Sequence, residues 1–437
     1  MFKILIKILL PAVLLSLPLP AVSLDEAVAS AEKNNINLEM ARISLNQILR
    51  NQNNVMSTFM PSLTANAGIS TGAAFPPALK ETTYNGLGIS AGINAGFNFS
   101  GSMLNDSESR RLKKESAWLS YESTADSITE AVVSSYWQIA VLNAQKDAAA
   151  ASLEDASTAY SSAEESWENG MLSDLDLAQA ELAVTSAELK VQTVDDSIMK
   201  AMAAFRNMTG LEGDFSIDPL PDFTYLDLPS AEELFSEYSE MTNTVRSARN
   251  SLSTARNSEK SLKYSTYVPS VSVGVNYSYA GSYDDSWKYS DRTHSLTGSV
   301  TVSVPVSAMI PGGSGYMAVK DAGDAVTLAS LSLQNEQRTL LENIRSAVMD
   351  IEQSENNRKS TEKALQNAER SYNLTMEAFD AGLVSADKLD SARNSYLIAQ
   401  TNLMALDADH ITACYKLADI LNISFSELKT KYSTETI

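Results

Sequence analysis

The sequence predicts a mainly α-helical protein with a small β part, in which long helices form antiparallel coiled-coil hairpins. Two segments of about 60 residues, 102–167 and 325–381, contain neither glycine nor proline, the residues that most often interrupt helices. Four shorter segments alternate apolar and small polar residues, as β-strands with two different faces do. The same order of patterns occurs twice, which predicts a duplicated unit.

The composition excludes several classes of function. The 437 residues include 33 Lys or Arg and 54 Asp or Glu, which gives a formal net charge of -21. Such a chain repels nucleic-acid phosphates, and no basic patch offsets the repulsion. One Cys and two His are too few for an internal disulfide or a thiolate or imidazole metal cluster. No Ser–His–Asp set, phosphate loop or paired-carboxylate site has supporting context, so we expect neither an enzyme nor a cofactor.

Residues 1–23 are predicted to be a signal peptide that directs export from the cytoplasm. Two lysines accompany an apolar run that extends to Leu19, and Ala21-Val22-Ser23 offers small residues for cleavage after Ser23. A buried first helix is the alternative, but three prolines in this segment oppose it. We expect the mature chain to begin near Leu24. It would carry no lipid anchor, because no cysteine follows the cleavage site.

Residues 24–437 are predicted to form a single unit made of two repeats. Matching residues recur 212 positions later in the chain. The pairs are Leu153 and Leu365, Ala156 and Ala368, Tyr160 and Tyr372, Gly170 and Gly382, and Ser173 and Ser385. This unbroken register predicts a first repeat over 24–226 and a second over 227–437, joined by the proline-bearing segment 211–229.

The β part is predicted as four strands near residues 63–75, 87–99, 270–280 and 296–305. Their polar face carries Gly, Ser, Thr and Asn but no charge, which favours a face toward a lumen over one toward open solvent. Tilted strands of about 9–11 residues are long enough to cross an outer membrane. Four strands alone would leave edge groups unpaired in lipid. Three chains sharing one barrel would supply twelve strands.

The helices that follow each glycine show coiled-coil spacing. Their apolar residues step by three and four, as at a coiled-coil seam. These residues are Leu177, Ala180, Val184, Ala187 and Val191 in the first repeat, and Leu389, Ala392, Tyr396, Ala399 and Leu403 in the second. Gly170 and Gly382 are predicted to turn the chain at hairpin tips, and Gly210 and Asn422 to end the following helices.

The ordered set of patterns resembles the TolC family of outer-membrane efflux proteins, the outer membrane factors. The phrases that carry the resemblance are Met60-Pro61-Ser62-Leu63, Tyr267-Val268-Pro269-Ser270-Val271, Asn169-Gly170-Met171-Leu172-Ser173 and Ala381-Gly382-Leu383-Val384-Ser385. No single phrase is decisive, but their order covers essentially all of residues 24–437. The resemblance implies a homotrimer with a twelve-stranded β-barrel in the cell outer membrane and an α-helical tunnel in the periplasm.

The resemblance also implies a passive exit duct of a tripartite efflux pump or a type I secretion system, used by drugs or secreted substrates. Such a duct contacts outer-membrane lipid and docks on a periplasmic adaptor (membrane fusion) protein and an inner-membrane pump, which supplies the energy. The alternative is an exported coiled-coil structural or surface protein without channel activity. The uncharged polar strand faces, and hairpins placed between helices, favour the duct.

The resemblance places adaptor contacts at the two glycine turns. The expected docking residues are Gly170, Met171, Leu172, Ser173, Gly382, Leu383, Val384 and Ser385. The alternative is that both glycines only terminate helices, and the two roles are compatible.

Charged residues beyond these turns are candidates for a constriction at the periplasmic end. Members of the family commonly place aspartates six and nine residues after the second-repeat glycine, where this chain has Lys388 and Ser391. Asp387 and Asp390 stand one place earlier, and Asp176 occupies the sixth position in the first repeat. The alternative is that these aspartates only favour the positive ends of helix dipoles. Lys388 could instead pair with Asp176 and hold the duct closed.

His410 and Cys414 lie on or beside the second coiled-coil seam. We therefore predict a packed, hydrogen-bonded histidine and a packed thiol rather than a ligand site.

Overall fold

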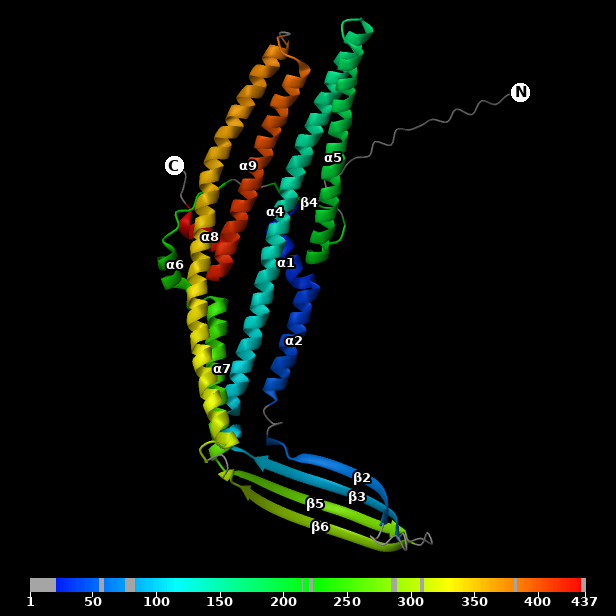
Figure 1. Ribbon diagram of the computed structural model, residues 1–437, viewed down its shortest axis with the longest axis vertical. Coiled ribbons are helices and arrows are strands. Elements are labelled where there is room, and N and C mark those ends of the chain that lie inside the picture. The colour runs from blue at the N-terminus through cyan, green and yellow to red at the C-terminus, as the bar shows by residue number, and fades with distance from the viewer. Residues whose placement is uncertain are drawn as a thin grey trace, which may run out of the picture. The chain divides into compact units, whose positions relative to one another are not determined.

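A computed structural model describes residues 21–54, 59–74, 83–213, 215–219, 223–283, 289–306, 310–380 and 383–433. Figure 1 shows the helices and strands of this part of the chain. The predicted signal peptide lies outside the described residues except for Ala21, Val22 and Ser23. No helix in the described ranges is both long enough and apolar enough to cross a bilayer.

The chain forms two compact units, and each contains segments of both sequence repeats. The first unit comprises Met1–Met40, Ser123–Tyr238 and Glu342–Ile437, and the second comprises Ala41–Glu122 and Ser239–Leu341. The two compact units therefore do not correspond to the two repeats, because each unit contains segments that are distant in the sequence.

Four helices account for most of the described chain. They are α4 (Asp106–Glu168), α5 (Asp174–Thr209), α8 (Ser314–Asp380) and α9 (Ala386–Leu421). Both α5 and α9 have 36 residues, and they begin and end 212 positions apart. Helix α8 begins eleven residues before the segment predicted from the absence of glycine, because it accommodates both Gly315 and Gly323.

Shorter helices precede each pair of long ones. In the first repeat these are α1 (Leu24–Asn34) and α2 (Ile36–Asn53), and in the second they are α6 (Ala231–Tyr238) and α7 (Asn243–Tyr267). Helix α10 (Phe425–Tyr432) follows α9. The predicted helix ends at Gly210 and Asn422 are confirmed, since both residues are left-handed C-caps with φ of 68° and 57°.

The β part is an antiparallel sheet with the strand order β2-β3-β5-β6 (Figure 1). Its strands are β2 (Ser62–Ala74), β3 (Thr83–Phe99), β5 (Ser270–Tyr283) and β6 (Tyr289–Ser303). Strand β6 begins seven residues before the predicted start at 296. Arg292 and His294 interrupt the alternation of apolar and small polar residues there, so the sequence pattern missed the first half of the strand.

Glycines on the polar face of this sheet stand opposite polar side chains. The pairs are Ser62 with Gly96, Asn66 with Gly92, Gly68 with Ser90, Ser70 with Gly88, and Gly274 with Ser299. A Cβ at Gly88 would lie 2.7 Å from the Ser70 hydroxyl oxygen, so glycine makes room for its neighbour. These paired groups are small and uncharged, and they satisfy one another.

Amide side chains continue this pattern across three strands. The Asn94 amide donates to the Asn66 side-chain oxygen at 3.1 Å, and the Asn276 amide donates to Asn94. Strands β2, β3 and β5 are thus linked by side chains as well as by backbone bonds. The row helps to fix their register, because a slip of one residue would turn every amide to the other face.

A buried tyrosine organises the core of the first unit. Tyr136 is 0% exposed, and burial raises its pKa to about 12. Its hydroxyl donates to the Val22 carbonyl at 2.8 Å and accepts from the Asp218 N–H at 3.1 Å. Val22 belongs to strand β1 (Ala21–Val22), which pairs in parallel with strand β4 (Ser216–Ile217), and Asp218 directly follows β4. One side chain therefore joins α4 to two segments that are distant in the sequence.

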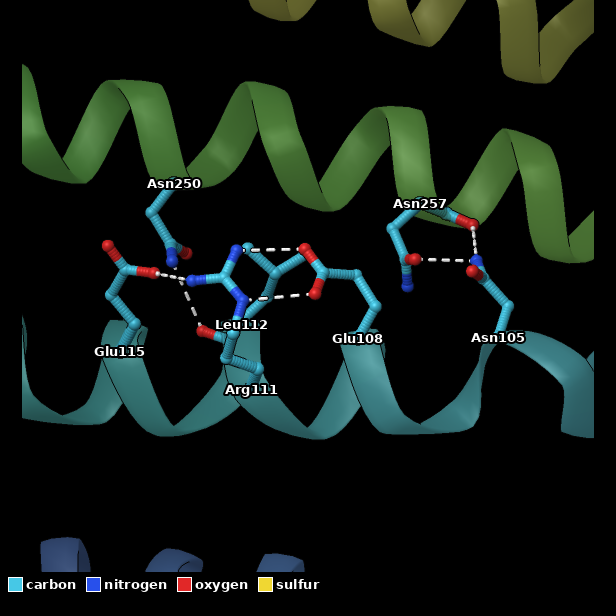
Figure 2. Close-up of polar contacts among 7 residues, drawn as sticks. All are labelled: Asn105, Glu108, Arg111, Leu112, Glu115, Asn250 and Asn257. Atoms are coloured by element: carbon cyan, nitrogen blue, oxygen red, sulfur yellow. Dashed lines mark hydrogen bonds and ion pairs between the residues drawn. The ribbon is translucent and has the colours of Figure 1, made fainter.

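Buried asparagines join α7 to the start of α4 in the second unit. Figure 2 shows Asn250 and Asn257 projecting from α7 toward α4. The Asn105 amide donates to the Asn257 side-chain oxygen at 2.5 Å, and the Asn250 amide donates to the Leu112 carbonyl at 3.2 Å. The two α7 asparagines are one heptad apart, and buried amides at such spacing fix the register of packed helices.

An exposed ion-pair cluster lies along α4 beside these amides (Figure 2). Arg111 donates two bonds to Glu108, at 2.8 and 3.0 Å, and one to Glu115 at 2.9 Å. Because these groups are largely exposed, the pairs stabilise the helix only slightly.

The approach of α7 to the segment before α4 leaves no room for a side chain at Gly101. A Cβ there would lie 2.4 Å from the Tyr264 carbonyl oxygen. We expect Gly101→Ala to lower the free energy of unfolding by about 1–3 kcal/mol through forced displacement, measured by denaturant unfolding of the purified protein. Gly298→Ala is the control, because a Cβ there meets nothing within 4 Å. Equal midpoints for both variants would contradict the expectation.

Candidate functional site

The turn between α4 and α5 is built by a left-handed glycine. The Gly170 N–H donates to the Trp167 carbonyl at 2.8 Å, and the Met171 N–H donates to the Ser166 carbonyl at 2.9 Å. Gly170 has φ of 71°, and a Cβ there would meet nothing within 4 Å. The backbone conformation, rather than lack of space, therefore requires glycine at this tip.

The turn between α8 and α9 repeats this geometry where it can be described. The Leu383 N–H donates to the Ala378 carbonyl at 2.8 Å, the equivalent of the Met171 bond 212 positions earlier. Gly382 lies outside the described residues. Ser385 is the N-cap of α9 as Ser173 is of α5, although only Ser173 makes a side-chain cap bond.

Side-chain bonds close the first tip. The Trp167 indole N–H donates to the Asp174 carboxylate at 2.7 Å. The Ser173 hydroxyl oxygen accepts from the Asp176 N–H at 3.2 Å, and the hydroxyl donates to the Asp176 carboxylate at 2.6 Å. Four residues thus hold the end of α4 and the beginning of α5 in one fixed turn.

The predicted docking residues include two large apolar side chains that are almost fully exposed. Met171 is 74% and Leu383 is 78% exposed, at equivalent positions of the two tips. Leu172 and Val384 are half-buried, and Ser173 and Ser385 are exposed. Exposed apolar groups held on rigid turns are suited to contact with another protein.

No ion pair among the described residues joins the candidate aperture residues of the two repeats. Asp176 and Lys388 are both exposed, and the ion pairs of the described residues include none between them. Asp390 is half-buried in α9, and Asp387 lies in the first turn of the same helix, with its side chain outside the description. A pair between Asp176 and Lys388 therefore stays a prediction for the assembled protein.

Arg393 of α9 is a buried cation that the sequence patterns did not single out. It is 8% exposed, donates to the Ala151 carbonyl at 2.7 Å and forms an ion pair with Asp155, both on α4. This contact joins the helical hairpin of one repeat to that of the other. The only sequence signal was a charge beside the seam residue Ala392. The equivalent position in the first repeat is Glu181, so the contact occurs once.

His410 is the buried, hydrogen-bonded histidine that the seam predicted. Its Nε2 lies 3.1 Å from the Thr224 carbonyl oxygen, which can only accept, so Nε2 carries the proton. Nδ1 lies 2.7 Å from the Ser354 hydroxyl oxygen, whose hydrogen also has the Ile351 carbonyl oxygen within reach at 2.7 Å. Burial, with the nearby charge of Arg358, lowers the pKa of His410. The imidazole ring stacks on the Phe223 ring, with 4.2 Å between the ring centroids. The described residues hold no group of three or more potential metal ligands.

The sequence matches the family described as outer membrane efflux protein over residues 27–211 and 242–422. These two segments cover most of the chain. The chain belongs to the outer membrane efflux protein family. Among curated proteins, none matches the sequence significantly.

Solved structures of outer-membrane channels share the fold of this efflux protein. CusC, studied for transmembrane channel formation, matches with a TM-score of 0.71 and 17% identity over 91% of both chains. The CmeC outer membrane channel of Campylobacter jejuni matches with a TM-score of 0.70 and 18% identity, over 93% of this chain and 88% of that one. The open-state MtrE outer membrane channel of Neisseria gonorrhoeae matches with a TM-score of 0.70 and 14% identity, over 92% of this chain and 89% of that one.

Family membership confirms the resemblance that the sequence showed, and the fold confirms the mainly helical class with a small β part. The roles of the tip and aperture residues stay predictions.

We expect Arg393→Met to loosen the contact between α9 and α4 in the efflux protein, because it leaves the Asp155 carboxylate and the Ala151 carbonyl without their partner. Amides near residues 151–156 should then exchange with deuterium about tenfold faster, since local opening costs less. Arg370→Met is the control, as Arg370 is an exposed arginine on α8. Identical exchange rates in both variants would mean that the Arg393 contact does not stabilise this part of α4.

Proposed function

We propose that this chain is one third of a homotrimeric outer-membrane channel, the passive exit duct of a tripartite efflux pump or a type I secretion system. The observation that carries the proposal is a sheet with two open edges, one exposed and mainly apolar face, and one polar face of small residues. The polar face is uncharged from Ser62 to Gly68 and across the paired strands.

The apolar face of the sheet is suited to lipid. Large side chains on the two edge strands are mostly exposed, which water would disfavour. They are Leu63 (73%), Ile69 (74%), Leu296 (75%), Val300 (71%) and Val302 (62%). A bilayer would cover them without any further protein element.

The open edges support a barrel shared between chains. Strands β2 and β6 have 13 and 15 residues, and each has a single neighbour in the described sheet. In lipid, the unpaired backbone groups of such edges would each cost several kcal/mol, roughly. If β6 of one chain pairs with β2 of the next, three chains close a twelve-stranded barrel. Its polar face then surrounds the lumen.

The helices offer a second surface for the same trimer. Leu175, Leu182 and Leu189 of α5 are 67%, 65% and 60% exposed and lie one heptad apart. Such a stripe is the seam of a coiled coil that lacks its partner. Packing against a neighbouring chain would cover it and form the wall of a helical tunnel in the periplasm.

The tips complete the proposed assembly. The exposed Met171 and Leu383 would contact a periplasmic adaptor, which links the duct to an inner-membrane pump. The pump supplies the energy, so the duct needs no catalytic group or cofactor. Asp176, Asp387, Lys388 and Asp390, near the same end of the helices, are proposed to line the aperture.

The experiment for the channel is purification from the outer-membrane fraction followed by planar-bilayer recording. We expect a heat-resistant trimer that conducts ions. Leu182→Lys should reduce the trimer fraction, because it puts a charge on the apolar stripe, whereas Glu188→Lys, at an exposed charged position of α5, should not. A soluble monomer without conductance would instead support an exported coiled-coil structural protein.

The tips are tested separately by adaptor binding. We expect Met171→Lys and Leu383→Lys to lower co-purification of the adaptor about tenfold, as loss of an apolar anchor does, with the trimer intact. Glu188→Lys is again the control. Bulky residues at the half-buried Leu172 or Val384 should act likewise. Undiminished adaptor recovery in every tip variant would remove the docking assignment.

A further inference from the structure

We propose that the export protease cleaves this precursor between Ala21 and Val22, so that the mature chain begins at Val22. This is two residues before the start that the Ala21-Val22-Ser23 motif indicates, and it rests on the predicted signal peptide. The inference comes from the contacts of Val22 and Ser23, which are part of the folded first unit rather than of a discarded leader.

Val22 is bound on two sides. Its carbonyl accepts from the Tyr136 hydroxyl at 2.8 Å, and it pairs with Ile217 in the short parallel sheet. Its side chain packs against the core cluster that contains Tyr136 and Phe205. Cleavage after Ser23 would leave the buried Tyr136 hydroxyl without an acceptor, and an unsatisfied buried hydroxyl costs about 1–3 kcal/mol.

Ser23 begins the first helix. Its hydroxyl oxygen accepts from the Glu26 N–H at 3.3 Å, and its own N–H donates to the Glu26 carboxylate at 3.2 Å. These reciprocal bonds form a capping box. The Ser23 carbonyl also accepts the first helical bond, from Ala27 at 3.0 Å. A chain that starts at Leu24 would lose all three bonds.

A start at Leu24 would also place a new charge unfavourably. The α-ammonium group would stand at the positive end of the α1 dipole, where cations are disfavoured. Ser23 and Leu24 line a cavity of about 250 Å³ together with Trp137 and His410, so removal of Ser23 would widen this cavity. A start at Val22 moves the ammonium group two residues away and keeps the cap.

The sequence allows the earlier site. Export proteases prefer small residues one and three positions before the cleaved bond. After the apolar run only Ala21 and Ser23 qualify for the first of these positions ahead of Leu24, and Leu19 occupies the second for the earlier site. Ala21 is exposed and pairs with Ser216 in the short sheet. Its removal loses that pairing but none of the side-chain bonds above. Hydrolysis would add water across the bond, leaving a carboxylate on Ala21 and an ammonium group on Val22.

The decisive measurement is the N-terminal peptide of the protein purified from a host with an outer membrane. We expect it to begin Val22-Ser23-Leu24. A peptide that begins at Leu24, or an uncleaved precursor, would overturn the proposal.

Two precursor variants separate the sites without relying on the fold of the mature protein. Ser23→Asp removes the small residue before the later bond but keeps an N-cap side chain, so processing should be unchanged. Leu19→Asp stands three residues before the earlier bond and also shortens the apolar run, so precursor should accumulate, and normal processing of this variant would count against the earlier bond. Loss of processing in Ser23→Asp, with normal processing in Leu19→Asp, would assign the later bond and reject the proposal.

Discussion

The structure depends on the need of backbone N–H and C=O groups for partners where water is absent. A four-stranded sheet satisfies its inner strands and leaves one side of β2 and of β6 open. Helices satisfy their own backbone except at the ends, where Gly170, Ser173, Gly210 and Asn422 supply the missing bonds. In the described part of the chain these two strand edges stay open, and in the proposed trimer other copies of the chain would pair with them.

The two repeats share backbone hydrogen bonds and helix lengths, but they differ in their buried side-chain contacts. Both tips share the bond that reaches back five residues, and both following helices have the same length. The buried contacts differ, because Arg393 replaces Glu181 and His410 replaces Ile198 at equivalent positions. The backbone requirement is the same in both repeats, whereas the helical hairpin of each repeat has different neighbours.

This difference explains what could be predicted from the sequence. Periodicity identified the long helices and the four strands, and glycine or asparagine identified the C-caps, because these are local properties. The partner of Arg393, the Asn250 and Asn257 contacts and the β1–β4 pair were missed, since each joins residues more than 100 positions apart. The tip residues were recognised through the family, and their exposure came only from the fold.

The glycine pairing of the sheet has a mechanical consequence for the proposed duct. From Ser62 to Gly68 and across the paired residues of the neighbouring strands, every residue on the polar face is uncharged and none is longer than asparagine. The bore of a barrel built from this sheet would therefore be set by the backbone itself. Along this stretch the wall would be smooth, neutral and already hydrogen-bonded, so a passing molecule would find few groups to which it could adhere.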